Sequence, residues 1–216
     1  MPLQNRVMPT GEIVALSGRG LVIGNRGVLH DDRRRIVRTT QLKRWIACRL
    51  AFRGRHRTVM TPRRWTELFF LDEATAFAAG HRPCAECRNA DYKRFRALWE
   101  RCFGGPAGAE AMDAVLHAQR LDGRAKRTRR SDVATLPDGT YVSIDGIPRI
   151  VWHDELVAWG DAGYGDRQPR PNHGDVDVLT PPAIVAVFKA GYLPDVHPSL
   201  DAGRMRHAEA ATSGDR

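Results

Sequence analysis

Two cysteines three residues apart, Cys84 and Cys87, constrain this chain more than any other feature of its sequence. Pro83 immediately precedes the first cysteine and Gly80 lies just upstream, which is typical of a turn that presents two side chains from one short segment. A pair of thiolates at this spacing offers two ligands to a single tetrahedral zinc ion. The sequence therefore predicts a zinc site that includes Cys84 and Cys87.

Redox dithiols use the same Cys-x-x-Cys spacing, but they occur beside a βαβ pattern of parallel strands. No such pattern precedes Cys84. Instead, the apolar segment 65–70 predicts a short strand, and Asp72 is a candidate N-cap for a helix over roughly 73–79 that Gly80 would end. This order of strand, helix and cysteine turn favours a metal site over a redox pair.

Ten residues around the cysteine pair form a pattern: Phe69, Phe70, Ala74, Ala76, Ala79, Gly80, Arg82, Pro83, Cys84 and Cys87. This pattern resembles the second half of the zinc-binding module of the Ada family, in which four cysteines hold zinc and one accepts a methyl group from a DNA phosphotriester. The resemblance covers about 25 of the 216 residues, and His81 stands where the family usually has an aromatic residue. It implies zinc as the cofactor and DNA as the partner.

The first cysteine pair of the Ada pattern is not intact in this chain. Residues 38–40 are followed by a single cysteine, Cys48, and Phe52 stands four positions after it. Related short modules with the same second half use a histidine among their first two ligands, which makes His30 a candidate. The predicted ligands are therefore Cys84, Cys87, Cys48 and His30, with His56, His81 or a more distant acid left open as alternatives.

The other two cysteines also have readings that involve no metal. Alternation across residues 44–52 places Cys48 on an apolar strand face, where it would be a small buried side chain. Cys102 lies in a predicted helix over residues 90–103 on the same stripe as Phe95 and Trp99, so we expect it to pack in the core.

Charge is distributed unevenly along the chain, whose formal net charge is +9. Residues 1–60 hold 13 Lys and Arg against 3 Asp and Glu, residues 61–130 hold 14 against 9, and residues 131–216 hold 7 against 13. Arginine supplies nearly all of the surplus, and its guanidinium donates two parallel hydrogen bonds to phosphate oxygens. An arginine-rich proteome would explain the preference for arginine over lysine, but not the scarcity of acids in residues 1–60.

The first 130 residues are therefore predicted to contact nucleic acid, and the Ada resemblance favours DNA. The densest basic runs mark the expected phosphate contacts. These are Arg33, Arg34, Arg35, Arg53, Arg55, Arg57, Arg124, Lys126, Arg127, Arg129 and Arg130.

A helix predicted over residues 107–121 carries the best catalytic candidates, Asp113 and His117. They are four residues apart, so both side chains lie on one helix face. A carboxylate beside an imidazole can orient it and raise its basicity, which suits a general base. An exposed ion pair has the same spacing, so the pattern fits a structural role as well.

Strand patterns lie on both sides of the predicted helices. Near the N-terminus we expect antiparallel strands at residues 12–16, 21–23, 34–39 and 44–52. In the second half, Asp145 and Gly146 separate the apolar runs 140–144 and 147–152, which is a strong hairpin signal. Further elements are strands at 156–159 and 175–179 and a helix over 182–190 with Thr180 as its N-cap.

The expected fold class is α+β: a basic antiparallel β region with an Ada-like zinc knuckle, central helices, and a C-terminal β-hairpin sheet or small barrel. We divide the chain into residues 1–104, residues 105–200 and a small polar tail over 201–216 that is expected to be disordered.

Composition excludes two classes of protein. No apolar run approaches 18 residues and no basic, apolar leader opens the sequence, so no membrane partner is expected. The chain has 4 cysteines at irregular spacings, unlike a secreted disulfide framework. The expected compartment is the cytoplasm, with association with the nucleoid as an option.

These patterns together predict a zinc-containing DNA-binding protein of DNA repair or modified-DNA processing. If it is an enzyme, the expected reaction is hydrolysis of an N-glycosidic or phosphodiester bond around Asp113 and His117. Two alternatives stay open at this point: a non-catalytic nucleic-acid-binding or regulatory module, and alkyl transfer to a zinc-bound cysteine.

Overall fold

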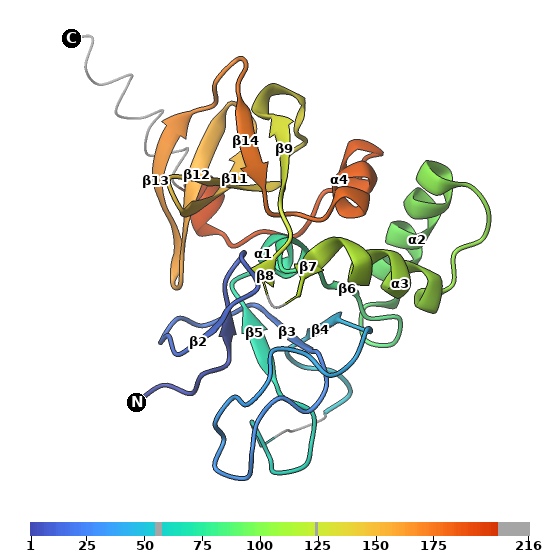
Figure 1. Cartoon of the computed structure of the whole chain (residues 1–216), viewed down its shortest axis with the longest axis vertical. Coiled ribbons are helices and arrows are strands. Elements are labelled where there is room, and N and C mark those ends of the chain that lie inside the picture. The colour runs from blue at the N-terminus through green and yellow to red at the C-terminus, as the bar shows by residue number, and fades with distance from the viewer. Residues whose placement is uncertain (55–57, 124, 203–216) are drawn as a thin grey trace.

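A computed structural model describes residues 1–54, 58–123 and 125–202 (Figure 1). Within these ranges the chain is a mixed α+β structure with two 6-stranded sheets and a 2-stranded ribbon. Helices lie between the sheets and beside them (Figure 1). None of the helices in these ranges is long and apolar enough to cross a membrane.

The first sheet has the strand order β2-β1-β5-β3-β4-β6 and is built from strands of only two to four residues. Its neighbours pair antiparallel except for β1 with β5 and β4 with β6, which are parallel. The predicted antiparallel region is therefore a mixed sheet. The strand expected at 34–39 is reduced to one isolated bridge between His30 and Ile36. The strands are β1 (Arg6–Val7), β2 (Ile13–Val14), β3 (Val22–Asn25), β4 (Ile46–Arg49), β5 (Leu68–Phe70) and β6 (Arg82–Pro83).

Helix α1 (Glu73–Ala78) is completely buried and lies between the two sheets (Figure 1). Its predicted N-cap is confirmed, because Asp72 Oδ1 accepts a hydrogen bond from the Thr75 backbone N–H at 2.8 Å. Gly80 follows the helix with a φ of +93°, a conformation that favours glycine. The small side chains of α1 pack on both sides: Ala76 joins the core of the first sheet, and Ala74 joins that of the second.

Three further helices share one apolar cluster: α2 (Asn89–Phe103), α3 (Ala109–Arg120) and α4 (Pro182–Lys189). Phe95 and Trp99 of α2 are buried in this cluster, as the sequence pattern indicated. The prediction that Cys102 is a core residue is wrong, since it lies exposed in the last turn of α2. The cluster combines residues from both sides of position 104, so α2 and α3 are packed as one unit, and the domain boundary at 104 stays a prediction.

The second sheet is antiparallel throughout, in the order β13-β12-β11-β10-β14-β9. Asp145 and Gly146 both have positive φ, +51° and +77°, which confirms the predicted tight hairpin turn. β13 and β9 are edges of the described sheet, so it is open and not a closed barrel. Its strands are β9 (Arg129–Asp132), β10 (Tyr141–Ile144), β11 (Ile147–Trp152), β12 (Glu155–Gly160), β13 (Gly163–Pro169) and β14 (Asp175–Val178).

Smaller elements complete the description. The short strands β7 (Leu121–Asp122) and β8 (Ala125–Lys126) form the ribbon, and a 3-10 turn covers Val133–Thr135. Thr180 does not cap α4: its hydroxyl oxygen accepts a hydrogen bond from the Tyr141 backbone N–H at 2.9 Å, and Pro181 occupies the cap position. Of the predicted tail, residues 203–216 lie outside the described ranges.

Candidate metal centre

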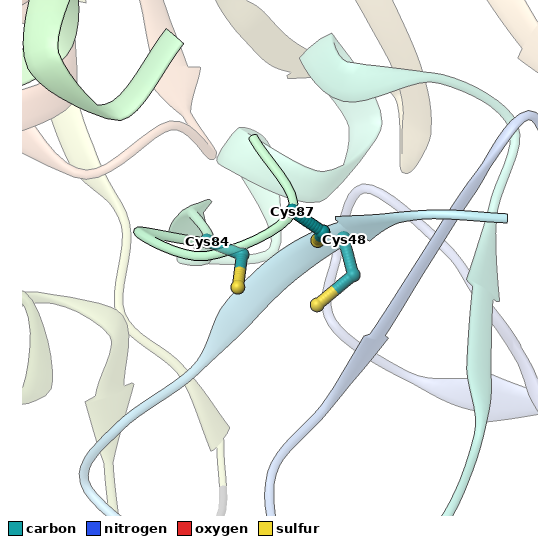
Figure 2. Close-up of side chains that lie close together, drawn as sticks. All are labelled: Cys48, Cys84 and Cys87. Carbon is teal, nitrogen blue, oxygen red and sulfur yellow. The ribbon is translucent and has the colours of Figure 1, made fainter. Parts of the chain in front are cut away.

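The sulfur atoms of Cys48, Cys84 and Cys87 lie within 4.8 Å of one another (Figure 2). Cys48 belongs to β4, whereas Cys84 and Cys87 belong to the turn that joins β6 to α2. The parallel pairing of β4 with β6 brings them together, since the Cys84 backbone N–H donates to Ala47 O at 2.9 Å. A long-range contact between two short strands thus adds a third thiol to the predicted pair.

Backbone N–H groups point at these sulfur atoms. Arg49 N donates to Cys87 Sγ at 3.4 Å. Hydrogen bonds from the Cys48 and Cys87 side chains and from the backbone of Cys87 and Glu86 lower the pKa of Cys84. Its partner Cys48 has a raised pKa, chiefly because of its side-chain hydrogen bond with Cys84. The group therefore favours a thiolate at Cys84, and thiolate is the form that binds metal.

Three sulfur ligands fit a metal ion that prefers soft donors. Zinc bonds to cysteine sulfur at about 2.3 Å in a tetrahedron, so its sulfur ligands are spaced by a little under 4 Å. The three cysteines meet that spacing with little movement, and Cys48 and Cys84 are buried while Cys87 is half-buried. The group can hold a metal ion through these three residues.

His30 does not join this group. Its Nδ1 lies 2.7 Å from Thr66 Oγ1 and its Nε2 lies 3.2 Å from Thr61 O, so both ring nitrogens are engaged elsewhere. Thr66 Oγ1 also accepts from the Leu29 backbone N–H at 2.8 Å. His30 thus ties the β3–β4 loop to the β4–β5 loop instead of offering a ligand.

His81, one of the other histidine alternatives, does not join the group either. His81 is buried against the Trp45 and Phe70 rings, with centroid distances of 5.1 Å and 4.6 Å. His56 lies outside the described residues.

Asp113 and His117 do not form the expected pair. Asp113 accepts two hydrogen bonds from Arg82, from Nε to Oδ1 at 3.0 Å and from Nη2 to Oδ2 at 2.8 Å. Both side chains of this ion pair are buried. Within the described residues, His117 Nδ1 has no hydrogen-bond partner, and desolvation followed by repulsion from Arg120 lowers the pKa of His117. Asp113 is therefore the partner of Arg82, which precedes the cysteine turn, and not of His117 as the helix spacing suggested.

The predicted phosphate-binding arginines of the first sheet lie on its loops. Arg33 and Arg34 are exposed in the β3–β4 loop, and Arg53 is exposed in the β4–β5 loop. Arg35 forms an ion pair with Asp31 at 2.7 Å. Both loops extend from the sheet in Figure 1, away from the second sheet. Arg55, Arg57 and Arg124 of the predicted set fall outside the described residues.

The third predicted basic run does not form one surface. Lys126 turns inward, and its ammonium donates to Ala78 O. Arg127 lies 3.7 Å from Asp122 and Arg130 lies 3.9 Å from Asp177, whereas Arg129 is exposed on β9. The acidic neighbours of Arg127 and Arg130 weaken the surplus charge that the sequence run suggested.

Sequence reasoning missed a cavity of about 300 Å³ beside the sulfur group. Cys48, Arg49 and Arg88 line it together with Glu73. Arg88 is buried and pairs with Glu73 at 2.8 Å, and with Asp91 and Asp195. The position of Arg88 directly after Cys87 is a sequence feature that could have placed it near the metal group. Glu73 and Asp195 come from distant segments, so no local pattern indicates that they meet Arg88.

No protein family, curated protein or solved structure matches this chain. What the site does must therefore be argued from its own geometry and chemistry.

Proposed function

We propose that this protein binds zinc through Cys48, Cys84 and Cys87, and that the metal holds together a nucleic-acid-binding surface that acts on DNA. The observation that carries the proposal is the grouping of three thiol sulfur atoms within 4.8 Å. All-cysteine groups of this kind favour zinc over hard cations such as magnesium, which prefer oxygen ligands.

Metal analysis of the purified protein tests the first half of this proposal. We expect close to one zinc per chain in the wild type and in Cys102→Ser, because Cys102 lies in α2 away from the group. Replacing both Cys84 and Cys87 by serine should remove the zinc. A protein that retains zinc without these two cysteines contradicts the assignment.

Exposed arginines on two linked loops support the nucleic-acid half of the proposal. Within the described residues, Arg33 and Arg34 form no ion pair, so their guanidinium groups are available to phosphate. His30 and Thr66 fasten the two loops to each other, which would hold Arg53 in a constant position relative to Arg33. A surface with fixed positive charges releases counterions when it binds DNA, so affinity should fall steeply with salt.

Fluorescence anisotropy with a labelled DNA duplex at several salt concentrations measures this dependence. Changing Arg33 and Arg34 together to glutamine should reduce the slope of log K against log salt by about 2, since each phosphate contact contributes about 0.9. The matched control changes Arg96 and Arg101 on α2. An equal slope for both double variants would exclude Arg33 and Arg34 as phosphate contacts.

The reaction on DNA is tested by incubating the zinc protein with unmodified and base-modified duplexes, followed by a gel with and without alkali. Strand breaks that need alkali indicate hydrolysis of an N-glycosidic bond, and breaks without alkali indicate phosphodiester hydrolysis. Shifted but intact DNA supports a non-catalytic binding module. The His117→Ala variant decides whether this imidazole takes part, because no described residue depends on its Nδ1 for a hydrogen bond.

A second candidate function is alkyl transfer to Cys48, which lines the cavity beside the sulfur group. Bound zinc would be needed to keep Cys48 as a thiolate, because its pKa is raised in the group without metal. In such a step the Cys48 thiolate attacks the methyl carbon of a phosphotriester, the carbon–oxygen bond breaks, and the phosphodiester anion leaves. The product would be a protein heavier by one methyl group at Cys48 after incubation with alkylated DNA. An unchanged mass removes this candidate and leaves the zinc and DNA-binding proposals intact.

A further inference from the structure

Three basic side chains from separate segments line one cavity of about 270 Å³, whose lining includes none of the three grouped cysteines. Arg26 follows β3, Arg120 ends α3, and Lys126 belongs to β8. Arg26 and Arg120 are the most buried of the three, with 1% and 0% of their surfaces exposed. Buried arginines are ordinarily paired with carboxylates, so their grouping calls for a counter-charge.

The hydrogen-bonding capacity of these guanidinium groups is only partly used. Arg26 Nη1 donates to Gly11 O at 2.9 Å, and Arg120 Nη1 donates to Gly80 O at 2.8 Å. Within the described residues, Arg26 Nη2 and Arg120 Nε have no hydrogen-bond partner although both atoms are buried. Buried donors without acceptors are costly, and they therefore point to a missing acceptor in the cavity.

Positive charge is also concentrated around the cavity. Arg26 and Arg120 each lie with the guanidinium carbon 4.0 Å from the centre of the Trp45 ring, so they are no farther apart than twice that distance. The ring stabilises each cation but does not remove their mutual repulsion. Burial, then repulsion from Arg120, lowers the pKa of Arg26 to about 9. Burial and repulsion from Arg82 lower the pKa of Arg120 to about 10.

No acidic residue among the described cavity-lining side chains neutralises this group from within. Glu12 lines the cavity but is exposed. Asp113, whose charge acts on Arg120, does not line the cavity, and both of its carboxylate oxygens accept from Arg82. His81 borders Arg26, and desolvation lowers its pKa well below the usual value, so it is neutral and adds no counter-charge. The cavity is therefore a preformed positive site.

We propose that this cavity, lined by Arg26, Arg120 and Lys126, binds a phosphate group. A phosphate dianion supplies several strong acceptor oxygens around one centre, which matches guanidinium and ammonium donors that converge from different directions. Thr10 and Thr39 also line the cavity and add hydroxyl groups of the kind that bind phosphate oxygens. The site shares no residue with the sulfur group. Arg26 and Thr39 belong to the β3–β4 loop that also carries Arg33 and Arg34, but neither of those two arginines lines the cavity.

Calorimetric titration of the full chain with inorganic phosphate, without DNA, tests the proposal. We expect saturable binding in the wild type and at least a tenfold loss of affinity in Lys126→Met. The matched control Lys43→Met removes the same charge from an exposed side chain outside the cavity lining and should change affinity less than twofold. Absence of phosphate binding, or equal losses in the two variants, would overturn the proposal.

Thermal unfolding distinguishes a variant that has lost the phosphate site from one that has lost its fold. A Lys126→Met protein that unfolds at or above the wild-type temperature, but whose unfolding temperature phosphate no longer raises, supports a lost site and not a lost structure. If this variant fails to fold, Arg26→Lys takes its place, because it keeps the charge and removes the Nη2 donor; an undiminished affinity there would overturn the proposal.

A second ligand series tests the class of anion and its source. Sulfate that binds as tightly as phosphate at about pH 8 would overturn the assignment to a phosphate dianion. Inorganic phosphate that is displaced by a 5′-phosphorylated oligonucleotide, but not by its unphosphorylated form, identifies a nucleic-acid end as the source. Displacement by small phosphate esters alone identifies a small phosphorylated molecule.

Discussion

The two large sheets of this protein are stabilised in different ways. Strands of the first sheet have two to four residues and pair in both directions, whereas the second sheet is antiparallel throughout and its strands reach seven residues. Side chains hold much of the first sheet together, such as His30 with Thr66 and the three cysteines. The second sheet relies on its backbone ladder and on apolar residues such as Ile150 and Val157.

The first sheet, with its short strands, carries the grouped cysteines, and the second sheet has a regular structure without such a group among its described residues. Short strands with long loops leave polar and sulfur side chains free to converge, and loops on a stable frame are where binding residues usually lie. The regular sheet has little such freedom, because alternate side chains are used for its core. We therefore expect each substitution to change the stability of one sheet more than that of the other.

Loss of the metal group should have the largest effect and should act on one sheet only. Changing Cys84 and Cys87 to serine removes two of the three proposed zinc ligands. Apparent binding free energies of structural zinc in small peptides are about 10–16 kcal/mol. Hydrogen exchange should therefore accelerate in β3 and β4 well before it does in β10 and β11. The Cys102→Ser variant is the control, and a uniform acceleration in both sheets would break the comparison.

Removing Asp113 should destabilise the protein strongly, because it leaves Arg82 buried without its partner. Breaking a buried ion pair costs about 3–5 kcal/mol, so Asp113→Ala should lower the free energy of unfolding by that amount in urea titration. Glu110→Ala, at an exposed position on the same helix, should cost under about 1 kcal/mol. A stable Asp113→Ala protein would contradict the structural role of this carboxylate.

A backbone change in the second sheet should have a moderate effect. Gly146 has a φ of +77° in the β10–β11 turn, so alanine at this position is strained by about 1 kcal/mol. Gly165→Ala in β13 is the matched control, because a side chain there would meet no atom within 4 Å and its backbone shows no positive φ. Equal urea midpoints for the two variants would argue against the strained turn.

The last expected effect is a pH dependence of stability that involves Lys126. Burial, then repulsion from Arg26 and Arg120, lowers the pKa of Lys126 to about 7, below the usual value of about 10.4. The unfolded chain then binds more protons between about pH 7 and pH 10, so stability should rise with pH across this window. Without phosphate, that part of the rise should be missing in Lys126→Met. The wild type and Lys126→Met share the other titratable groups around the cavity, Glu12, His81 and Arg26. A difference in unfolding temperature between the two proteins that does not change with pH would therefore contradict the lowered pKa of Lys126.

Local elements were largely predictable from the sequence. The helix expected over residues 90–103 is α2, and the Asp145–Gly146 turn joins β10 to β11 as its residue types indicate. These elements depend on hydrogen bonds between near neighbours and on regular apolar spacing, both of which are visible in a linear pattern. Strands of two residues such as β1 and β6 carry no period, so they could not be recognised.

Sites built from distant segments were predicted less well. The sequence makes Cys48 and His30 equal candidates for zinc ligands. Cys48 lies beside Cys84 and Cys87, whereas His30 is hydrogen-bonded to Thr66 and does not join them. Helical spacing placed Asp113 near His117, yet it could not reveal that Arg82 from β6 would take the carboxylate. Competition between partners is decided by three-dimensional proximity, which spacing along one helix does not report.

The sequence by itself determined the cysteine pair, the helices, the hairpins of the second sheet and the concentration of arginine in the first half. Only the tertiary structure decided which third thiol joins the pair, and that Arg26, Arg120 and Lys126 meet at one cavity. Local structure follows from propensities and hydrogen bonds between residues close in the chain. Metal ligands and buried charges depend on which remote segments pack together, and that packing depends on the cooperative burial of the entire core.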